Sequence, residues 1–266
     1  MAGRKPYATK EQLAHDYLVL KLPIKEIAKK YGYADGTKAT RAILERCEIP
    51  TRSRRGLDRP RRPHKQMGLH LSPEARQVVY GCLLGDGTLR DHHKYGGNSH
   101  LCATHKASHW EYVEWLCKQL GPFYSGTTKR QPAYSEIVHK CEPSYMLRSI
   151  YHPDFSELRD RFYPEGKKIV PDGLLEELNP LAIAVWFMDD SCFNKKIKRI
   201  QLSTEGFLLN DQQKIISFFL DTWGFKGGIS SSTFGYRINF STTSTEDIRS
   251  LLTPHYIPCM YYKLGL

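Results

Sequence analysis

The sequence contains no apolar run long enough to cross a bilayer, and its cysteines show no paired spacing. None of its hydrophobic stretches approaches the roughly 18–20 residues that a membrane-spanning helix needs. Residues 1–10 are polar and lack the apolar stretch of a signal peptide. The 7 cysteines are scattered and odd in number, which is typical of reduced thiols. We therefore expect no membrane association and an intracellular protein, whether in the cytoplasm, the nucleoid or an organelle matrix.

The sequence also lacks low-complexity tracts and an excess of acidic residues. Its 266 residues are 40% hydrophobic, which is enough for a core in one large domain or in two domains of ordinary size. Lysine and arginine total 39 against 28 acidic residues, which gives a net charge of +11. This surplus favours a polyanionic partner, of which nucleic acid is the commonest. A merely basic protein without such a partner is the alternative.

Histidine and cysteine residues are frequent between positions 92 and 109, but their spacing matches no common zinc site. The residues are His92, His93, His100, Cys102, His105 and His109. We interpret them as ordinary surface and strand residues, with zinc binding as the alternative.

Residues 10–49 have apolar positions at intervals of three and four, which predicts three short helices. The string PIKEIAKKYGYADGTKATRAILE resembles helix-turn-helix domains, in which a short helix, a glycine turn and a recognition helix follow one another. We expect residues 1–50 to form such a small all-α domain, with Lys38, Thr40 and Arg41 facing the major groove of DNA. A plain three-helix bundle is the alternative.

Residues 51–70 form a basic linker in this interpretation. The stretch from Thr51 to Lys65 contains seven lysines or arginines, one acid and two prolines, so it cannot pack a core. We predict an extended segment that follows DNA phosphates, with a solvated hinge as the alternative. The arginines assigned to DNA contact are Arg52, Arg54, Arg55, Arg61 and Arg62.

From Leu71 onward, a mixed helix and strand pattern occurs twice. Two apolar helices each begin with a capping residue and a proline, Ser72–Pro73 and Asn179–Pro180. Strand-like stretches, an amphipathic helix and more strand follow each of them. An internal duplication, with repeats at 71–170 and 171–266, explains this pattern.

The strand-like stretches alternate apolar and polar residues, most clearly in the second repeat. Ile200 and Leu202 form one apolar series, and Tyr236, Ile238 and Phe240 form another. Period two predicts one face against a core and one polar, partly basic face outward. The polar positions assigned to base or phosphate contact are Thr104, Lys106, Arg199, Gln201, Ser203, Arg237, Asn239 and Ser241.

The two apolar helices read VVYGCLLGDGTL (78–89) and AIAVWFMDDSCF (182–193), and aligning them places Asp86 opposite Asp190. Each aspartate follows the C-terminal end of a helix, where the macrodipole is negative, so an acid there usually meets a cation. Two such carboxylates among free backbone carbonyls would suit a magnesium ion. A turn residue without catalytic role is the alternative for either aspartate alone; the matched pair favours the metal.

GCLLGDGTL and IAVWFMDDS resemble the two LAGLIDADG motifs of single-chain homing endonucleases, especially the I-SceI-like branch. The strings LNPLAIAVWFMDD (178–190), KKIVP (167–171) and YIPCMYYKL (256–264) follow in family-like order, so the resemblance covers 71–266. It implies an α+β fold in which two pseudo-symmetric αββαββα repeats form a saddle over the major groove. The second motif departs from the pattern, with Val185 opposite the glycine of the first motif and Ser191 at the final glycine.

The resemblance also implies an active site. Asp86 and Asp190, at the eighth motif position, would hold Mg²⁺ or Mn²⁺, and Lys168 and Lys263 would lie near the two cleavage centres. Such ions would lower the pKa of a water and stabilise the leaving 3′ oxygen, while the lysines orient that water or screen charge. The implied activity is hydrolysis of both strands of a long asymmetric double-stranded DNA target by a monomer, leaving 3′ overhangs. Lysines that merely follow phosphates or face solvent are the alternative.

Two other functions fit parts of the pattern. An RNA maturase that binds its host intron RNA would also use a basic saddle, but splicing assistance does not require the two aspartates. A regulator that joins helix-turn-helix and LAGLIDADG parts would bind DNA without cleavage, and it would be expected to lack the aspartates. The presence of both acids favours the nuclease.

Overall fold

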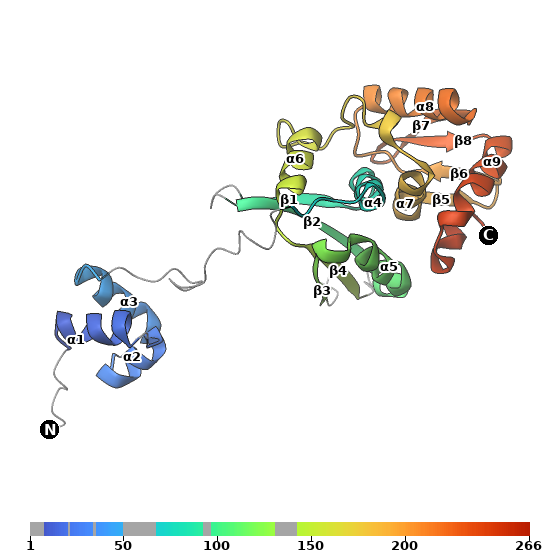
Figure 1. Ribbon diagram of the computed structural model, residues 1–266. Coiled ribbons are helices and arrows are strands. Elements are labelled where there is room, and N and C mark those ends of the chain that lie inside the picture. Colours follow the sequence, from blue (N-terminus) through green and yellow to red (C-terminus); the bar gives the residue numbers. More distant parts are fainter. Residues whose placement is uncertain (1–7, 21, 34–35, 50–67, 93–96, 131–142) are drawn as a thin grey trace. The chain divides into compact units, whose positions relative to one another are not determined.

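The computed structural model describes residues 8–20, 22–33, 36–49, 68–92, 97–130 and 143–266 (Figure 1). It divides into two compact units, residues 1–67 and 68–266. The five arginines that we predicted in the linker lie outside the described residues, as does nearly all of segment 51–70. Among the helices described, none is both long and apolar enough to span a membrane.

The first unit is all-helical in its described residues. Helix α1 (Lys10–Ala14) runs directly into a π-helical turn (His15–Val19), and α2 (Ile24–Tyr31) and α3 (Gly36–Arg46) follow. Gly32 ends α2 in the left-handed conformation, with φ of 71°, which glycine adopts without steric cost. The helices enclose a small core, which contains Leu13, Tyr17, Ile27, Leu44 and Ile49. The prediction of short N-terminal helices is therefore confirmed.

One predicted DNA contact in this unit is wrong. Thr40 is fully buried in α3, one helical turn before the equally buried Leu44, so it faces the core of the unit and not a major groove. Arg41 is half-buried beside it. The side chain of Lys38 lies outside the described residues.

The second unit consists of two αββαββα repeats, as we expected. The first contains α4 (Pro73–Leu84), β1 (Thr88–His92), β2 (Gly97–Lys106), α5 (Trp110–Leu120), β3 (Tyr124–Arg130), β4 (Ser144–Ser149) and α6 (Pro153–Phe162). The second contains α7 (Pro180–Asp190), β5 (Ser191–Asn194), β6 (Arg199–Leu202), α8 (Leu209–Trp223), β7 (Gly227–Ser232), β8 (Gly235–Phe240) and α9 (Thr242–Leu252). The strand orders, β1-β2-β4-β3 and β5-β6-β8-β7, are equivalent, and all pairs are antiparallel. This equivalence supports an internal duplication.

Helices α4 and α7 begin where the sequence predicts. The Ser72 hydroxyl accepts a hydrogen bond from the Ala75 N–H (3.1 Å), and the Asn179 amide oxygen accepts one from the Ala182 N–H (3.1 Å). A proline follows each cap, in the first turn. The caps therefore fix where both helices begin. Together with the lengths of the helices, they determine where the C-terminal ends lie.

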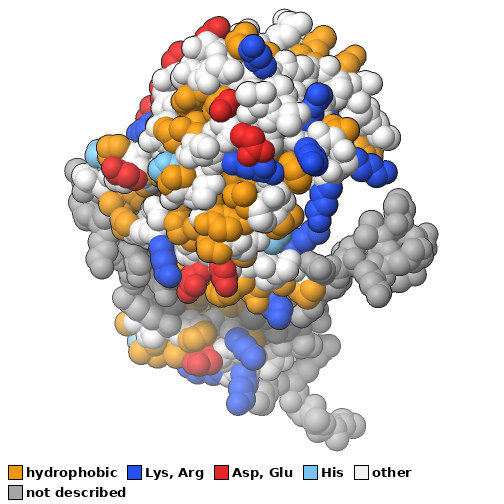
Figure 2. All heavy atoms as spheres, turned by 90° about the vertical axis from the view of Figure 1, so that its right-hand side faces the viewer, with side chains coloured by type: hydrophobic (Ala, Val, Ile, Leu, Met, Phe, Trp, Pro, Cys, Tyr) orange, Lys and Arg blue, Asp and Glu red, His pale blue; other side chains and the backbone are white. Residues whose placement is uncertain are grey.

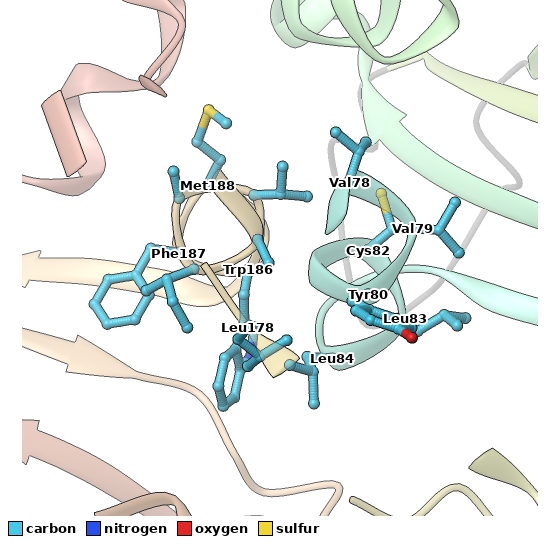
Figure 3. Packing of buried hydrophobic residues seen from close by; sticks show 14 of the residues in the cluster. Val78, Val79, Tyr80, Cys82, Leu83, Leu84, Leu178, Trp186, Phe187 and Met188 are labelled. Atoms are coloured by element: carbon cyan, nitrogen blue, oxygen red, sulfur yellow. The ribbon is translucent and has the colours of Figure 1, made fainter. Parts of the chain in front are cut away.

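Helices α4 and α7 lie side by side at the centre of the unit (Figures 1 and 3). A Cβ on Gly81 would lie 2.4 Å from the Ala182 carbonyl oxygen and 2.6 Å from the Val185 Cβ, so only glycine permits this approach. Val185 therefore fills the space that Gly81 leaves open, which explains the departure of the second motif. Below the contact, Leu84, Trp186 and their neighbours form one core shared by both repeats (Figure 3).

The strand alternation of the second repeat is confirmed with one exception. Ile200, Leu202, Ile238 and Phe240 are all buried against the core. Tyr236 is 44% exposed instead, because it pairs with the exposed Ser231 near the end of the β7–β8 hairpin, where the core no longer covers the strand.

Candidate metal centre and nucleic-acid interface

The two motif aspartates lie at equivalent places, beside the C-terminal ends of the packed helices. Asp86 follows α4 by two residues and its side chain is 46% exposed, while Asp190 is the last residue of α7 and is partly buried. Burial, followed by the negative charge of Asp86, raises the pKa of Asp190 to about 7. Burial also raises the pKa of Asp86. The carboxylate of Asp86 is therefore close enough to act on the protonation of Asp190.

A third carboxylate, which the sequence analysis did not assign, lies between them. Asp189 is buried and accepts hydrogen bonds from the Tyr112 hydroxyl (2.8 Å) and from the backbone N–H of Asp86 (3.1 Å). Burial raises its pKa well above the usual range, and the charges of Asp86 and Asp190 act in the same direction. The sequence signal was the pair of aspartates at the end of the second motif, where the first motif has Gly85.

His105 completes this group from strand β2. Its Nδ1 lies 3.6 Å from the Asp86 Oδ2, and its Nε2 lies 3.9 Å from the Asp189 Oδ1. Both separations are too long for hydrogen bonds. Burial lowers the pKa of His105 to about 3, so the imidazole is neutral at physiological pH. Among the described residues, Asp86, His105 and Asp189 each offer a ligand atom within 4.8 Å of the others.

The other residues considered for zinc do not join this group within the described part of the chain. His100 packs on Tyr151, with ring centroids 4.3 Å apart, and His109 contacts the Tyr262 hydroxyl at 3.0 Å. Cys102 is a buried free thiol. His93 and the side chain of His92 lie outside the described residues.

The two predicted lysines bind the ends of the motif helices. Lys168 donates to the carbonyls of Gly85 (2.9 Å) and Gly87 (3.1 Å), on either side of Asp86. Lys263 donates to the carbonyl of Asp189, the residue before Asp190. Burial lowers the pKa of both ammonium groups, and the nearby aspartates oppose that shift. Each lysine thus satisfies helix C-terminal carbonyls beside one motif aspartate.

The first sheet presents a basic face that the sequence analysis recognised only in part. Thr104 and Lys106 are exposed on β2, as predicted. Strand pairing places three arginines on the same face, since directly paired residues share a face. These are Arg90, Arg130 and Arg148, and their positive charges all act on the thiol of Cys102, opposing the burial that raises its pKa. The strands β3 and β4 had not been resolved in the sequence, so these arginines were missed.

The second sheet presents an amide-rich face. Gln201 donates to Asn239, whose amide donates to the Ser230 hydroxyl at 2.5 Å, so these side chains form a ladder across three strands. Arg199 is exposed on the same face, and Arg237 forms an ion pair with Glu205 at 2.8 Å. Figure 2 shows lysine and arginine side chains gathered at the upper right of the view, where few acidic side chains are visible.

Two further predicted contacts lie beyond the ends of the strands. Ser203 is exposed after β6, and its backbone N–H donates to the Asp190 carbonyl at 3.0 Å. Ser241 instead caps α9, because its hydroxyl accepts the Ser244 N–H at 3.1 Å. The Ser241 hydroxyl is thus engaged at the start of a helix, and its contact with DNA stays a prediction.

The paired repeats and the two helix-end aspartates define a two-motif LAGLIDADG protein. The model of the LAGLIDADG DNA endonuclease family matches residues 76–248, and the chain belongs to this family.

Three relatives illustrate the range of proteins to which this sequence is similar. Cytochrome b mRNA maturase bI2 of Debaryomyces hansenii is 27% identical over 200 residues, which cover 73% of this chain and 75% of that protein. Probable intron-encoded DNA endonuclease 3 of Mycosarcoma maydis is 31% identical over 127 residues, 46% of this chain and 93% of that protein. Protein RecA of Mycolicibacterium fallax is 28% identical over 207 residues, 73% of this chain and 47% of that protein. The chain thus spans about half the length of the RecA relative.

The structure of the homing endonuclease I-WcaI bound to its DNA recognition sequence is similar to this chain, with a TM-score of 0.69 and 22% identity. The match covers 78% of this chain and 95% of that one. It confirms the α+β fold of two repeats.

Proposed function

We propose that this chain is a site-specific endonuclease that hydrolyses both strands of a double-stranded DNA target with divalent metal ions. The observation that carries the proposal is the pair of carboxylates, Asp86 and Asp190, which come from equivalent ends of α4 and α7 and of which the first acts by its charge on the second. Membership of a DNA endonuclease family and the intron-encoded endonuclease relative support it.

The residues present fit Mg²⁺ or Mn²⁺. Hard divalent ions prefer carboxylate oxygens, and Asp86 and Asp190 would hold them. Burial first, and then the negative charge of Asp86, raise the pKa of Asp190, so the nearby lysines do not fully compensate an ionised carboxylate there. A divalent ion would supply this compensation and would activate a water for attack on the phosphodiester.

The two lysines position the aspartates in this proposal. Lys168 fixes the turn that carries Asp86, and Lys263 fixes the last turn of α7 before Asp190. Their positive charges also oppose the build-up of negative charge in the pocket, and they would stabilise charge on a phosphate placed above it.

The two sheet faces differ in chemistry, and this favours an asymmetric target. The arginines of the first face are suited to phosphates and guanine, whereas the amides of Gln201 and Asn239 are suited to adenine. Because one chain supplies both repeats, we propose that it acts as a monomer, cuts the strands at a stagger and leaves 3′ overhangs. The N-terminal unit would extend the contacted length of DNA by tethering a second binding module.

Cleavage of a selected target tests this proposal. Duplexes bound by the full chain are first enriched from a library in Ca²⁺ and cloned into a plasmid. We expect Mg²⁺ to convert this plasmid to the linear form, and Asp190→Asn to bind the target but to leave it intact. Cleavage by Asp190→Asn at the wild-type rate would refute the assignment of Asp190.

A second function, binding of host intron RNA as a maturase, is favoured by the similarity to the Debaryomyces hansenii maturase over most of this chain. It would use the same basic faces without the metal-binding acids. Asp86→Asn and Asp190→Asn should then preserve splicing of a host intron in vitro while abolishing DNA cleavage. If the wild-type chain leaves the splicing rate of its host intron unchanged, this second function is excluded.

A further inference from the structure

We propose that Asp86, His105 and Asp189 form a separate divalent-metal site with one nitrogen and two oxygen ligands, selective for transition-metal ions over Mg²⁺ and Ca²⁺. The site shares Asp86 with the proposed nuclease centre but excludes Asp190. Binding of an ion at this site does not depend on DNA cleavage, so the binding can be tested without a DNA substrate.

The Nε2 of His105 points into this site without a hydrogen-bond partner. Its side chain is only 2% exposed, and its Nε2 is buried and forms no hydrogen bond. A buried ring nitrogen normally pairs with a donor or acceptor, since leaving it unpaired costs about 1–3 kcal/mol. The two carboxylates stand 3.6 and 3.9 Å from its nitrogens, too far for hydrogen bonds. One ion can bind only one of these two ring nitrogens. One ligand atom from each of the three residues lies within 4.8 Å of the others, so an ion about 2.0–2.2 Å from each would draw them closer together.

The two carboxylates are also placed as metal binding requires. Asp189 is oriented by the Tyr112 hydroxyl and the Asp86 N–H, which resembles the outer hydrogen bonds that fix metal-binding carboxylates. Asp86 is nearly half exposed, which gives an ion access from solvent.

The chemistry of the donors decides the type of ion. Mg²⁺ and Ca²⁺ bind oxygen almost exclusively, whereas imidazole nitrogen suits Mn²⁺, Co²⁺ and Zn²⁺ increasingly along the series of divalent metals. A site with one imidazole and two carboxylates is therefore expected to prefer Co²⁺ or Zn²⁺. The Asp86–Asp190 pair offers oxygen only.

The site has no counterpart at the equivalent position of the other repeat, within the residues described. Thr88 pairs with Cys102 and Cys192 pairs with Gln201, so Thr204 is the residue equivalent to His105. The Thr204 hydroxyl donates to the Tyr236 carbonyl at 3.3 Å. Gly85 is the counterpart of Asp189 and carries no side chain. A nitrogen-containing site therefore forms only on the Asp86 side.

Titration of the full, metal-free chain with Co²⁺ tests this inference. Visible absorption reports nitrogen and oxygen coordination, and calorimetry gives the affinity. We expect the wild type to bind one Co²⁺ ion tightly. The affinity for Co²⁺ should be at least tenfold weaker in His105→Gln and unchanged in Asp190→Asn. His100→Gln, a buried β2 histidine that faces away from the acids, serves as the matched control and should bind like the wild type.

Thermal melting verifies that each variant is folded, and Asp189→Asn replaces His105→Gln if the latter unfolds. The inference is overturned if His105→Gln, or its replacement, binds Co²⁺ with wild-type affinity. It is also overturned if Asp190→Asn loses as much affinity as His105→Gln, since the ion would then occupy the shared Asp86–Asp190 site. Failure of Mg²⁺-dependent cleavage would instead count against the proposed nuclease and leave the Co²⁺ result standing.

Discussion

At the scale of single residues, the carboxylate of Asp190 makes stability depend on pH. Burial and the charge of Asp86 raise its pKa from the ordinary 3.8 to about 7 in the metal-free fold. The folded state therefore binds a proton more tightly than the unfolded state, so the associated stability is present below pH 3.8 and is lost as the pH rises through about 7. Ionised Asp190 next to Asp86 thus destabilises the metal-free protein at alkaline pH.

We therefore expect Asp190→Asn to melt at a higher temperature than the wild type at pH 8.5 without metal. The difference should be smaller at pH 5, because only part of the loss between pH 3.8 and about 7 has occurred there. Each kcal/mol would correspond to roughly 2–4 °C for a unit of this size. Scanning fluorimetry at both pH values measures the difference in melting temperature between the two proteins. Addition of Mg²⁺ should raise the melting temperature of the wild type only. A difference in melting temperature of the same size at pH 5 and at pH 8.5 would contradict this account.

The sequence identified the charged residues at the motif positions but not the neutral and buried groups around them. Asp86, Asp190, Lys168 and Lys263 follow from the motifs, and the structure brings them together. His105 could not be placed, because strand periodicity says which face a residue occupies and not which helix end lies opposite. Thr40 was misassigned since threonine is compatible with either face of a helix.

At the scale of elements, the approach of α4 to α7 determines whether the motif aspartates meet. Gly81→Ala would place a Cβ 2.4 Å from a backbone carbonyl, which no side-chain movement relieves. We expect a loss of about 1–3 kcal/mol from overpacking, which exceeds the ~1 kcal/mol that alanine gains in helix propensity.

Urea denaturation measures this loss, and Gly206→Ala is the matched control because nothing lies within 4 Å of its Cβ. The control should be neutral or slightly stabilising. If Gly81→Ala is as stable as Gly206→Ala, the close helix contact does not exist in solution.

The two sheet faces should respond differently to mutation. Arg148 donates to Thr128 on the basic face and is exposed, so Arg148→Ala should weaken binding to all DNA sequences and reduce the salt slope by about 1. Gln201→Ala should cost about 1–3 kcal/mol at one base pair and relax specificity there. Lys214 lies on α8 and forms an ion pair with Asp172. Lys214→Ala is the control and should change neither the salt dependence of DNA binding nor its base specificity. Binding titrations over a range of salt and target variants distinguish these outcomes.

The elements themselves were predictable where a local signal exists. Capping residues fixed the starts of α4 and α7, and strict alternation located β6 and most of β8. The strands β3 and β4 were not assigned because their residues alternate poorly, and Tyr236 was misjudged because hairpin ends extend beyond the core. Packing across the repeats, such as Val185 against Gly81, depends on three-dimensional proximity that no local pattern contains.

At the scale of the whole molecule, the positive charge is distributed unevenly between the two units. Residues 1–65 contain 17 lysines and arginines against 7 acidic residues, which leaves 22 against 21 in residues 66–266. Nearly all of the net charge of +11 therefore belongs to the N-terminal unit and the segment after it. In the proposed function, residues 66–266 would rely on the local basic faces of the sheets, while the first 65 residues would supply long-range attraction to DNA.

Deletion of residues 1–65 should consequently weaken DNA binding and flatten its salt dependence while keeping the position of cleavage. The released counterions scale with the phosphates neutralised, so the loss of many cationic contacts reduces the slope of log K against log salt. Cleavage mapping should show unchanged cut sites, because Asp86 and Asp190 both belong to the remaining unit. An unchanged affinity and salt slope after truncation would show that the N-terminal helices do not contact DNA.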